Sequence, residues 1–315
     1  MIKNKNSIKL ILLVFMVLFI SGCVTRLEDS EGDVVVEPNT GQTLTENILC
    51  RPNDPSIIEI YEENNIDLEE VPKCRDFTPA SGGYEGIWTS IFVKPVAFLI
   101  IFIGERVGNY GLAIILATLV IRFAMSPITR KSADQSEKMK QARPDLDEIE
   151  KKYKGKTNND RDVMLQKSQE TMAVYKKYGI SPASGCIFGF IQIPLFFAYY
   201  QALMRIPVIY EENFLGLSLG TNPSTAFSNG QYYYIITLVL LLTTTYFSFK
   251  LTGSSAASKE QEQQMQFMMK IMIVFILFAA FTFPTALAVY WITNSSFTIY
   301  QNIMSKRRIS NDKKD

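Results

Sequence analysis

A single positive charge inside a long apolar stretch limits what this chain can fold into. The stretch begins near Tyr110 and ends just before the strongly charged region that starts at Arg130. About 20 residues at 1.5 Å each are enough to cross a hydrocarbon core of roughly 30 Å. Arg122 lies eight residues before Arg130, roughly 12 Å inside the membrane edge. An arginine at the centre of such a helix costs at least about 2.5 kcal/mol, so the sequence predicts that Arg122 has a polar partner or a water-filled cavity.

The composition agrees with a membrane protein that has very polar loops. Hydrophobic residues make up 47% of the 315 residues, while charged residues still reach 20%. The chain has no histidine, which excludes Ser/His/Asp and Cys/His catalytic arrangements and every histidine metal site. The four cysteines are too scattered for a zinc motif. We therefore expect no metal and no other cofactor.

The first residues have the features of a bacterial lipoprotein signal. Three lysines precede an apolar run from Leu10 to Ile20, which is too short to span a membrane. The run is followed by Ser21, Gly22 and Cys23, an ending that resembles the lipobox, in which the cysteine is lipidated and becomes the new N-terminus. We predict a signal peptide over 1–22 and an acyl chain, such as palmitate, on Cys23. The alternative is a simple N-terminal anchor helix with an incidental cysteine.

Residues 23–85 are acidic and polar, and the lipoprotein signal would put them outside the cytoplasm. They lack a sustained periodic pattern, apart from a short predicted helix around Ile57 to Tyr61. Cys50 and Cys74 lie together in this exported region, where a disulfide between them is plausible. The alternative is two unpaired thiols in a loose linker.

Residues 86–107 are apolar but are interrupted by Lys94 and Pro95. Aromatic side chains recur at roughly helical spacing in this stretch. This pattern favours a helix that lies in the membrane interface, with its apolar face buried and its charges among the headgroups. The alternative is a further full span, against which Lys94 and Pro95 argue.

Five apolar segments are predicted to span the membrane, so the expected fold is an all-α polytopic membrane protein. The segments are 108–129, 183–206, 231–251, 266–282 and 285–304. Residues 130–178 hold thirteen Lys and Arg, the loop 207–230 holds none, and the tail 305–315 is basic again. By the positive-inside rule, the region 130–182, the short loop 252–265 and the tail are cytoplasmic. An external N-terminus followed by five spans gives the same internal C-terminus, which places the chain in a bacterial plasma membrane.

The cytoplasmic region 130–182 is predicted to form an antiparallel helical hairpin. Pro144 with three acidic residues after it looks like a helix start, and Gly155 marks a turn. The second helix carries a stripe at helical spacing, made of Met164, Ser168, Met172 and Tyr175. The charges of the hairpin form a solvated face in the simplest interpretation. The Met and Tyr side would in the other interpretation dock a partner or substrate.

Polar side chains on the spans are arranged to face Arg122. They are Thr118 and Ser126 on the same helix, Gln192 on the second span, Thr237, Thr244 and Ser248 on the third, and Trp291, Asn294, Thr298 and Gln301 on the fifth. By the helical rise, Gln192 and Thr298 lie at about the depth of Arg122. The five predicted spans contain no Asp or Glu, so we predict a hydrated cavity around Arg122. Helix packing is the alternative for the Ser and Thr residues, but packing does not require an arginine.

Several motifs in the same order resemble the YidC family of membrane protein insertases, in the five-span lipoprotein form of Gram-positive bacteria. The matching features are Pro95, the run from Ile121 to Ile128, the sequence from Tyr175 to Gly179, Pro182, Gly185 and Cys186, the run from Gln192 to Phe196, and Tyr290, Trp291 and Asn294. This resemblance implies a hydrophilic groove that is open to cytoplasm and lipid, closed on the outside, and positively charged at Arg122. It also implies transient contacts of nascent helices with Gln192 and Trp291. Residues 24–83 match no part of the family pattern.

In the mechanism that the resemblance implies, Arg122 attracts acidic residues of a client's polar tail. The client's apolar helix then moves past Trp291 into lipid. No bond is made or broken, so we expect a chaperone-like protein and no enzyme. The expected partners are nascent membrane proteins and lipids, without specific nucleic acid, while the Sec translocon and the ribosome stay open as further partners.

Two other functions compete with the insertase. A secondary transporter would use the same cavity for a small anion, but the spans offer no Asp, Glu or His for a proton relay and no visible inverted repeat. A structural lipoprotein scaffold would explain the hairpin but not a buried arginine.

Overall fold

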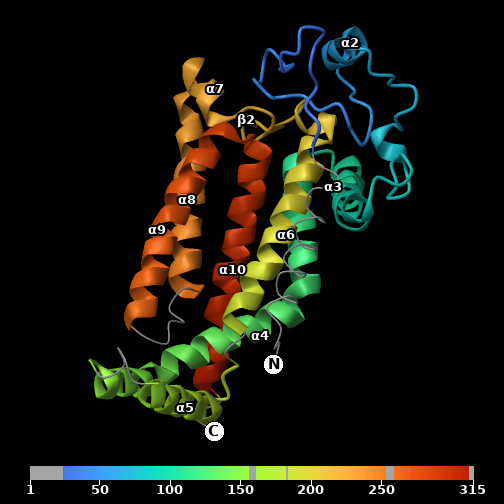
Figure 1. Cartoon of the computed structure of the whole chain (residues 1–315). Coiled ribbons are helices and arrows are strands. Elements are labelled where there is room, and N and C mark those ends of the chain that lie inside the picture. Colours follow the sequence, from blue (N-terminus) through green and yellow to red (C-terminus); the bar gives the residue numbers. More distant parts are fainter. Residues whose placement is uncertain (1–23, 156–160, 182–183, 253–258, 312–315) are drawn as a thin grey trace. The chain divides into compact units, whose positions relative to one another are not determined.

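The computed structural model describes residues 24–155, 161–181, 184–252 and 259–311 (Figure 1). The predicted signal peptide and Cys23 lie outside these residues. The described chain is mostly helical and divides into two compact units. The first unit comprises Met1–Thr118, Pro194–Thr237 and Ala280–Tyr290, and the second comprises Leu119–Ile193, Leu238–Ala279 and Trp291–Asp315.

The helices at the predicted spans each have residues in both units. They are α4 (Tyr110–Tyr153), α6 (Ser184–Met204), α8 (Ile235–Thr252), α9 (Lys259–Thr282) and α10 (Thr285–Asn311). Among the described residues, two helical stretches are long and apolar enough to cross a membrane, namely Tyr110–Tyr153 and Tyr232–Thr252, and Met269–Thr282 is a shorter apolar helix. The chain therefore has the apolar helices of a membrane protein.

The sequence prediction of a new helix at Pro144 is wrong. The first apolar segment and the first arm of the predicted hairpin are one helix of 44 residues, α4, which contains both Pro127 and Pro144. A proline removes one N–H and crowds the carbonyl four residues earlier, which bends a helix without always ending it. Because Lys, Gln, Ala and Glu around Pro144 are strong helix formers, the helix continues through it.

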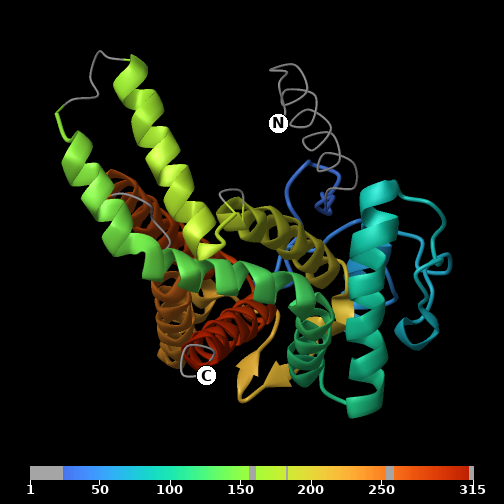
Figure 2. The ribbon, with the colours of Figure 1, turned by 90° about the horizontal axis from the view of Figure 1, so that it is seen from below.

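In the second unit, α5 (Arg161–Tyr178) lies beside the C-terminal part of α4 (Figures 1 and 2). A small apolar core joins them, made of Ala142, Leu146 and Ile180 with Met139, Val174, Tyr175 and Tyr178 packed against it. Two ion pairs also join the helices, Lys177 to Asp145 at 2.7 Å and Lys152 to Glu170 at 2.6 Å. The predicted stripe lines a hollow of about 480 Å³ on α5, together with Lys167 and Thr171.

In the first unit, residues 24–85 fold with little regular structure. They contain α2 (Pro55–Glu63), a 3-10 turn η1 (Cys74–Asp76) and isolated β-bridges. Asp54 caps α2, because its carboxylate accepts the backbone N–H of Ser56. The sequence predicts only this short helix here, since the segment lacks a longer periodic pattern.

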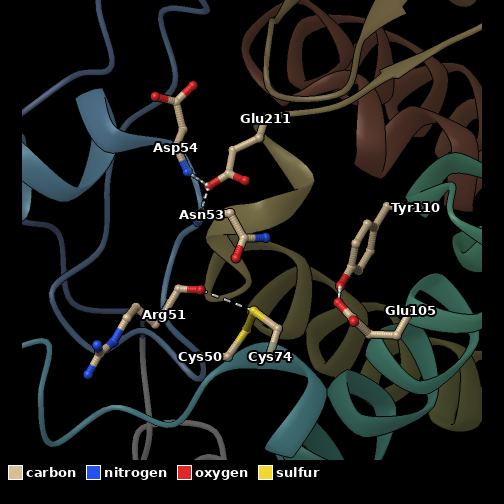
Figure 3. Close-up of a disulfide and its surroundings, with 8 residues drawn as sticks. All are labelled: Cys50, Arg51, Asn53, Asp54, Cys74, Glu105, Tyr110 and Glu211. Carbon is tan, nitrogen blue, oxygen red and sulfur yellow. Dashed lines mark hydrogen bonds between the residues drawn. A yellow bond between two sulfur atoms is a disulfide. The ribbon is translucent and has the colours of Figure 1, made fainter.

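Cys50 and Cys74 are joined by a disulfide, with sulfur atoms 2.09 Å apart (Figure 3). The bridge joins residues that are 24 apart in the sequence. A disulfide that closes a loop of this size stabilises a fold by about 3 kcal/mol. Beside it, the Glu211 carboxylate accepts the backbone N–H groups of Asn53 at 2.7 Å and Asp54 at 3.0 Å (Figure 3). This segment is therefore fastened to the loop that follows α6.

The helix after this segment begins with a π-helical turn, η2 (Thr89–Val93), and continues as α3 (Lys94–Val107). It ends at Gly108, which adopts the left-handed conformation with φ of 69°. One face is buried and carries Val93, Val96, Ala97, Ile100, Ile101 and Gly104, while Ile91, Phe92 and Phe102 are exposed. The helix therefore carries large apolar side chains on both a buried and an exposed face.

The predicted position of Lys94 among lipid headgroups is wrong. Its side chain is fully buried and forms an ion pair with Glu85 at 2.9 Å. Its ammonium also donates to the carbonyls of Ser81 at 2.7 Å and Gly83 at 2.6 Å. Glu85 in turn pairs with the buried guanidinium of Arg205 at 2.5 Å. A lysine can be buried once its charge and its donors are satisfied, and these partners come from a segment without a recognisable pattern.

The loop after α6 forms a compact structure in the first unit. It contains η3 (Pro207–Ile209), a two-stranded antiparallel hairpin of β1 (Asn213–Phe214) and β2 (Leu217–Ser218), α7 (Pro223–Ser228) and η4 (Tyr232–Tyr234). The nearby core includes a stacked pair, Tyr199 and Tyr290, whose ring centroids are 4.2 Å apart. Trp88 is also buried there and donates its indole N–H to Gln201 at 3.1 Å.

Candidate functional site

Arg122 is the centre of a buried polar cluster in the second unit. Its side chain is 1% exposed. Its Nε donates to the Asn294 amide oxygen at 2.6 Å, and its Nη2 donates to the Gln192 amide oxygen at 2.6 Å and also contacts Asn294. The three side chains come from α4, α6 and α10, and we call them the Arg122 cluster. The structure thus brings together three of the residues that the sequence predicts to face one another.

The Arg122 guanidinium lies among neutral amides, and the hydrated cavity around it stays a prediction. Two side-chain amides accept hydrogen bonds from its Nε and Nη2 atoms, and little of the side chain is exposed. Neutral amide oxygens satisfy hydrogen bonds without cancelling the charge. A carboxylate is a stronger acceptor, because a bond between two charged groups is roughly twice as strong as a neutral one. The cluster is therefore suited to exchange an amide for an acidic group.

Polar contacts between α4 and α10 continue on one side of the cluster. Gln301 donates to the Thr129 hydroxyl at 2.8 Å. Gln301 follows Asn294 by seven residues on α10, and Thr129 follows Arg122 by seven residues on α4. Further along, Asp134 accepts hydrogen bonds from Ser305 at 2.5 Å and Arg308 at 2.9 Å. This seven-residue spacing keeps the polar faces of the two helices in contact.

Trp291 is oriented by a residue that the sequence interpretation missed. Its indole N–H donates to the hydroxyl of Thr245 on α8 at 3.0 Å, and Thr245 is buried. The sequence prediction selected Thr244 instead, but the Thr244 hydroxyl bonds the carbonyls of Leu240 and Leu241 on its own helix. Three consecutive threonines give no signal that tells which one faces the neighbouring helix.

The other predicted residues have local roles. The Thr118 hydroxyl donates to the Ile114 carbonyl at 2.6 Å, and the Thr298 hydroxyl donates to the Asn294 carbonyl at 3.0 Å. Ser126 is buried in the second unit. These hydroxyls fit the packing alternative. Within the described residues, no group of three or more His, Cys, Asp or Glu side chains is arranged to hold a metal ion.

We expect that replacing Thr245 with valine loosens Trp291 while the shape of α8 is kept. Loss of the acceptor removes the hydrogen bond between the indole N–H and Thr245, and such a bond contributes about 0.5–1.5 kcal/mol. In a Trp88→Phe background, the emission of Trp291 should shift and its anisotropy should fall. Thr244→Val is the matched control, and equal changes in both variants would contradict a specific role for Thr245.

Comparison with known proteins identifies the family of this chain. A family model described as "60Kd inner membrane protein" matches residues 102–313. The membrane protein insertase YidC of Oceanobacillus iheyensis is 35% identical over 72% of this chain and 86% of its own length. The chain belongs to the YidC family. The insertase YidC 2 of Bacillus anthracis is 36% identical over 70% of this chain and 82% of its own length. MisCA of Bacillus subtilis, also a membrane protein insertase, is 33% identical over 72% of this chain and 82% of its own length.

The resemblance predicted from the motifs is therefore confirmed. A solved crystal structure of active YidC insertase, with the first transmembrane domain resolved, is 23% identical, has a TM-score of 0.49 and covers 79% of this chain. This YidC-family chain spans about half, 53%, of that solved chain. The family match begins at residue 102, so residues 24–85 and the first part of α3 precede the matched region.

Proposed function

We propose that this YidC-family chain is a membrane protein insertase of a bacterial plasma membrane. It accepts nascent transmembrane segments at the Arg122 cluster and releases them into the bilayer, alone or together with a Sec translocon. The observation that carries this proposal is a buried guanidinium held by two neutral amides from separate helices. Curated relatives of the chain are named membrane protein insertases.

The electrostatic step follows from the hydrogen bonds of the cluster. An acidic residue on the polar tail of a client competes with Gln192 and Asn294 for Arg122, and the charged acceptor binds more strongly. The attraction is stronger than in bulk water because the surroundings have a low dielectric constant. The rest of the client, an apolar helix, then moves into lipid past Trp291. The process needs only binding and transfer between phases, with no covalent chemistry.

The proposed topology has five spans, an external N-terminus and a cytoplasmic C-terminus. Its support is the distribution of Lys and Arg, together with the apolar stretches in α4 and α8. Lipidation at Cys23 would tether the exported segment to the outer surface. A disulfide between Cys50 and Cys74 suits that compartment, because disulfides persist in oxidising surroundings. The groove would open toward the cytoplasm, next to the α4–α5 hairpin.

Site-specific crosslinking tests the insertase proposal. A photoreactive group at Gln192 or Trp291 is placed in membranes that translate a single-span protein with an acidic N-terminal tail. We expect crosslinks to the nascent chain that disappear after its release into lipid. Val274 on α9, which is 67% exposed, is the matched control for unspecific contact in the membrane. Equal crosslinking at Val274, or none at Gln192 and Trp291 in a folded protein, would favour the transporter or the scaffold instead.

A further inference from the structure

The β1–β2 hairpin carries an apolar side chain in an unusual backbone conformation. Its two turn residues are Leu215, with φ of 52°, and Gly216, with φ of 82°. Two positive φ values are the geometry of a two-residue type I′ turn, in which Asn or Gly is normally favoured at the first position. A branched apolar residue is disfavoured in this conformation. Nevertheless Leu215 occupies it, and its side chain is 85% exposed.

The hairpin that presents Leu215 is held firmly within the first unit. Phe214 lies against α4 so closely that a Cβ atom at Gly111 would come within 2.2 Å of its ring. The backbone N–H of Ser218 donates to the hydroxyl of Tyr234 at 2.8 Å. The hairpin tip therefore has a fixed position relative to the start of α4 and to η4, while its apolar side chain points away from the protein.

Both anchoring points of the hairpin lie at the ends of apolar helices. The stretches Tyr110–Tyr153 and Tyr232–Thr252 are the two that are long and apolar enough to span a membrane among the described residues. At the start of the second stretch, Tyr232 and Tyr233 are 70% and 52% exposed, whereas Tyr234 is buried and holds the hairpin. Exposed tyrosines at a helix end are typical of the membrane–water interface.

We infer that the β1–β2 hairpin inserts Leu215 into the outer-leaflet interface and thereby fixes the depth of the loop 207–230. The occupant of this surface is lipid, because the hairpin that carries the exposed leucine is anchored at the ends of two apolar helices, one of which has exposed tyrosines. The same loop has no Lys or Arg that could pair with the phosphates of lipid headgroups. This inference rests on the proposed topology, in which the loop is external, and not on insertion activity.

Spin-label accessibility tests the inference in the full-length chain, reconstituted into vesicles of phosphatidylethanolamine and phosphatidylglycerol. Cys186 is replaced with serine, and a nitroxide is attached at Leu215→Cys or, as control, at Ser228→Cys in α7. Ser228 is exposed in the same loop. The label at 215 should collide with oxygen several-fold more often than with a water-soluble nickel chelate, and the label at 228 should show the reverse. A label at 215 as accessible to nickel as that at 228 would overturn the inference.

A second variant separates lipid insertion from the fold of the hairpin. Asparagine suits the left-handed conformation better than leucine, so Leu215→Asn should keep or raise the Tm in detergent. In this variant a label at Asn213→Cys should become several-fold more accessible to the nickel chelate than in the parent. Unchanged accessibility would contradict the anchor. A label at 215 that is shielded from both oxygen and nickel would show a protein partner and would also overturn it. Crosslinking from Gln192 tests the insertase proposal separately. The insertase proposal and the lipid anchor at Leu215 can therefore fail independently of each other.

Discussion

Replacing Arg122 with alanine is expected to lower insertion of a single-span client with an acidic tail by roughly tenfold or more. A hydrogen bond to a charged group contributes roughly 1.5–3 kcal/mol, and 1.4 kcal/mol corresponds to a factor of ten. The measurement is protease protection of the translated client in membrane vesicles, compared at equal levels of the insertase. For a client whose tail acids are replaced by amides, the same substitution should lower insertion much less, because that client is attracted less strongly by the guanidinium.

Two further substitutions separate the charge of Arg122 from its hydrogen bonds. Arg122→Lys keeps the charge but loses the planar fork that reaches both Gln192 and Asn294. Arg122→Gln keeps a donor but loses the charge. If attraction of the acidic tail is the dominant step, lysine should retain more insertion than glutamine. Full activity of Arg122→Gln on the acidic client, with a normal Tm, would contradict the electrostatic mechanism.

The Arg122 cluster is largely predictable from the sequence because a membrane helix has a strict period and a fixed length. Residues three, four or seven apart share a face, and distance from the charged cytoplasmic edge gives depth. The shared face selects Gln192 and Asn294, which the structure brings to Arg122, whereas depth selects Gln192 and Thr298. Neither rule predicts that both amides bond the same guanidinium, because a shared face and a similar depth do not fix which side-chain atoms meet.

Contacts that depend on irregular segments are not predictable in this way. Glu85 belongs to a stretch without a helical or strand period, so no pattern relates it to Lys94 or to Arg205, 120 residues later. The continuity of α4 through Pro144 is also hidden, since the same residue and its acidic followers fit a helix start as well as a helix interior. In both cases packing in three dimensions decides between local alternatives of similar free energy.

Replacing Glu85 with alanine is expected to destabilise the first unit by about 3 kcal/mol, or roughly 6–12 °C in Tm. Glu85 bridges Lys94 and Arg205, whose side chains are 0% and 1% exposed. Removing one partner of a buried ion pair leaves an uncompensated charge, which costs about 3–5 kcal/mol, and here it affects two cations. The lower end of that range applies because the Glu85 side chain is itself 30% exposed. Thermal unfolding of the purified chain in detergent measures the change.

A surface ion pair provides the matched control for this substitution. Glu170 pairs with Lys152 at 2.6 Å, but both side chains are exposed. Exposed pairs contribute about 0–1 kcal/mol, so Glu170→Ala should shift the Tm little. Adding Lys94→Met to Glu85→Ala should recover part of the lost stability, because one unpaired buried charge is removed. Equal effects of Glu85→Ala and Glu170→Ala would mean that the buried bridge contributes no more than a surface contact.

The bridge also predicts how the stability of the first unit changes in acid. Burial alone raises the pKa of Glu85, but the hydrogen bonds and charges of Lys94 and Arg205 outweigh it, so the net pKa is lowered. The folded state therefore binds this proton more weakly than the unfolded state. The stability contribution is complete above the unfolded pKa and is lost as the pH falls through the folded pKa. The Tm difference between the parent and Glu85→Gln should narrow between about pH 6 and pH 3. A constant difference over that range would contradict this prediction. It would mean that the contribution of Glu85 to stability does not depend on the protonation of its carboxylate.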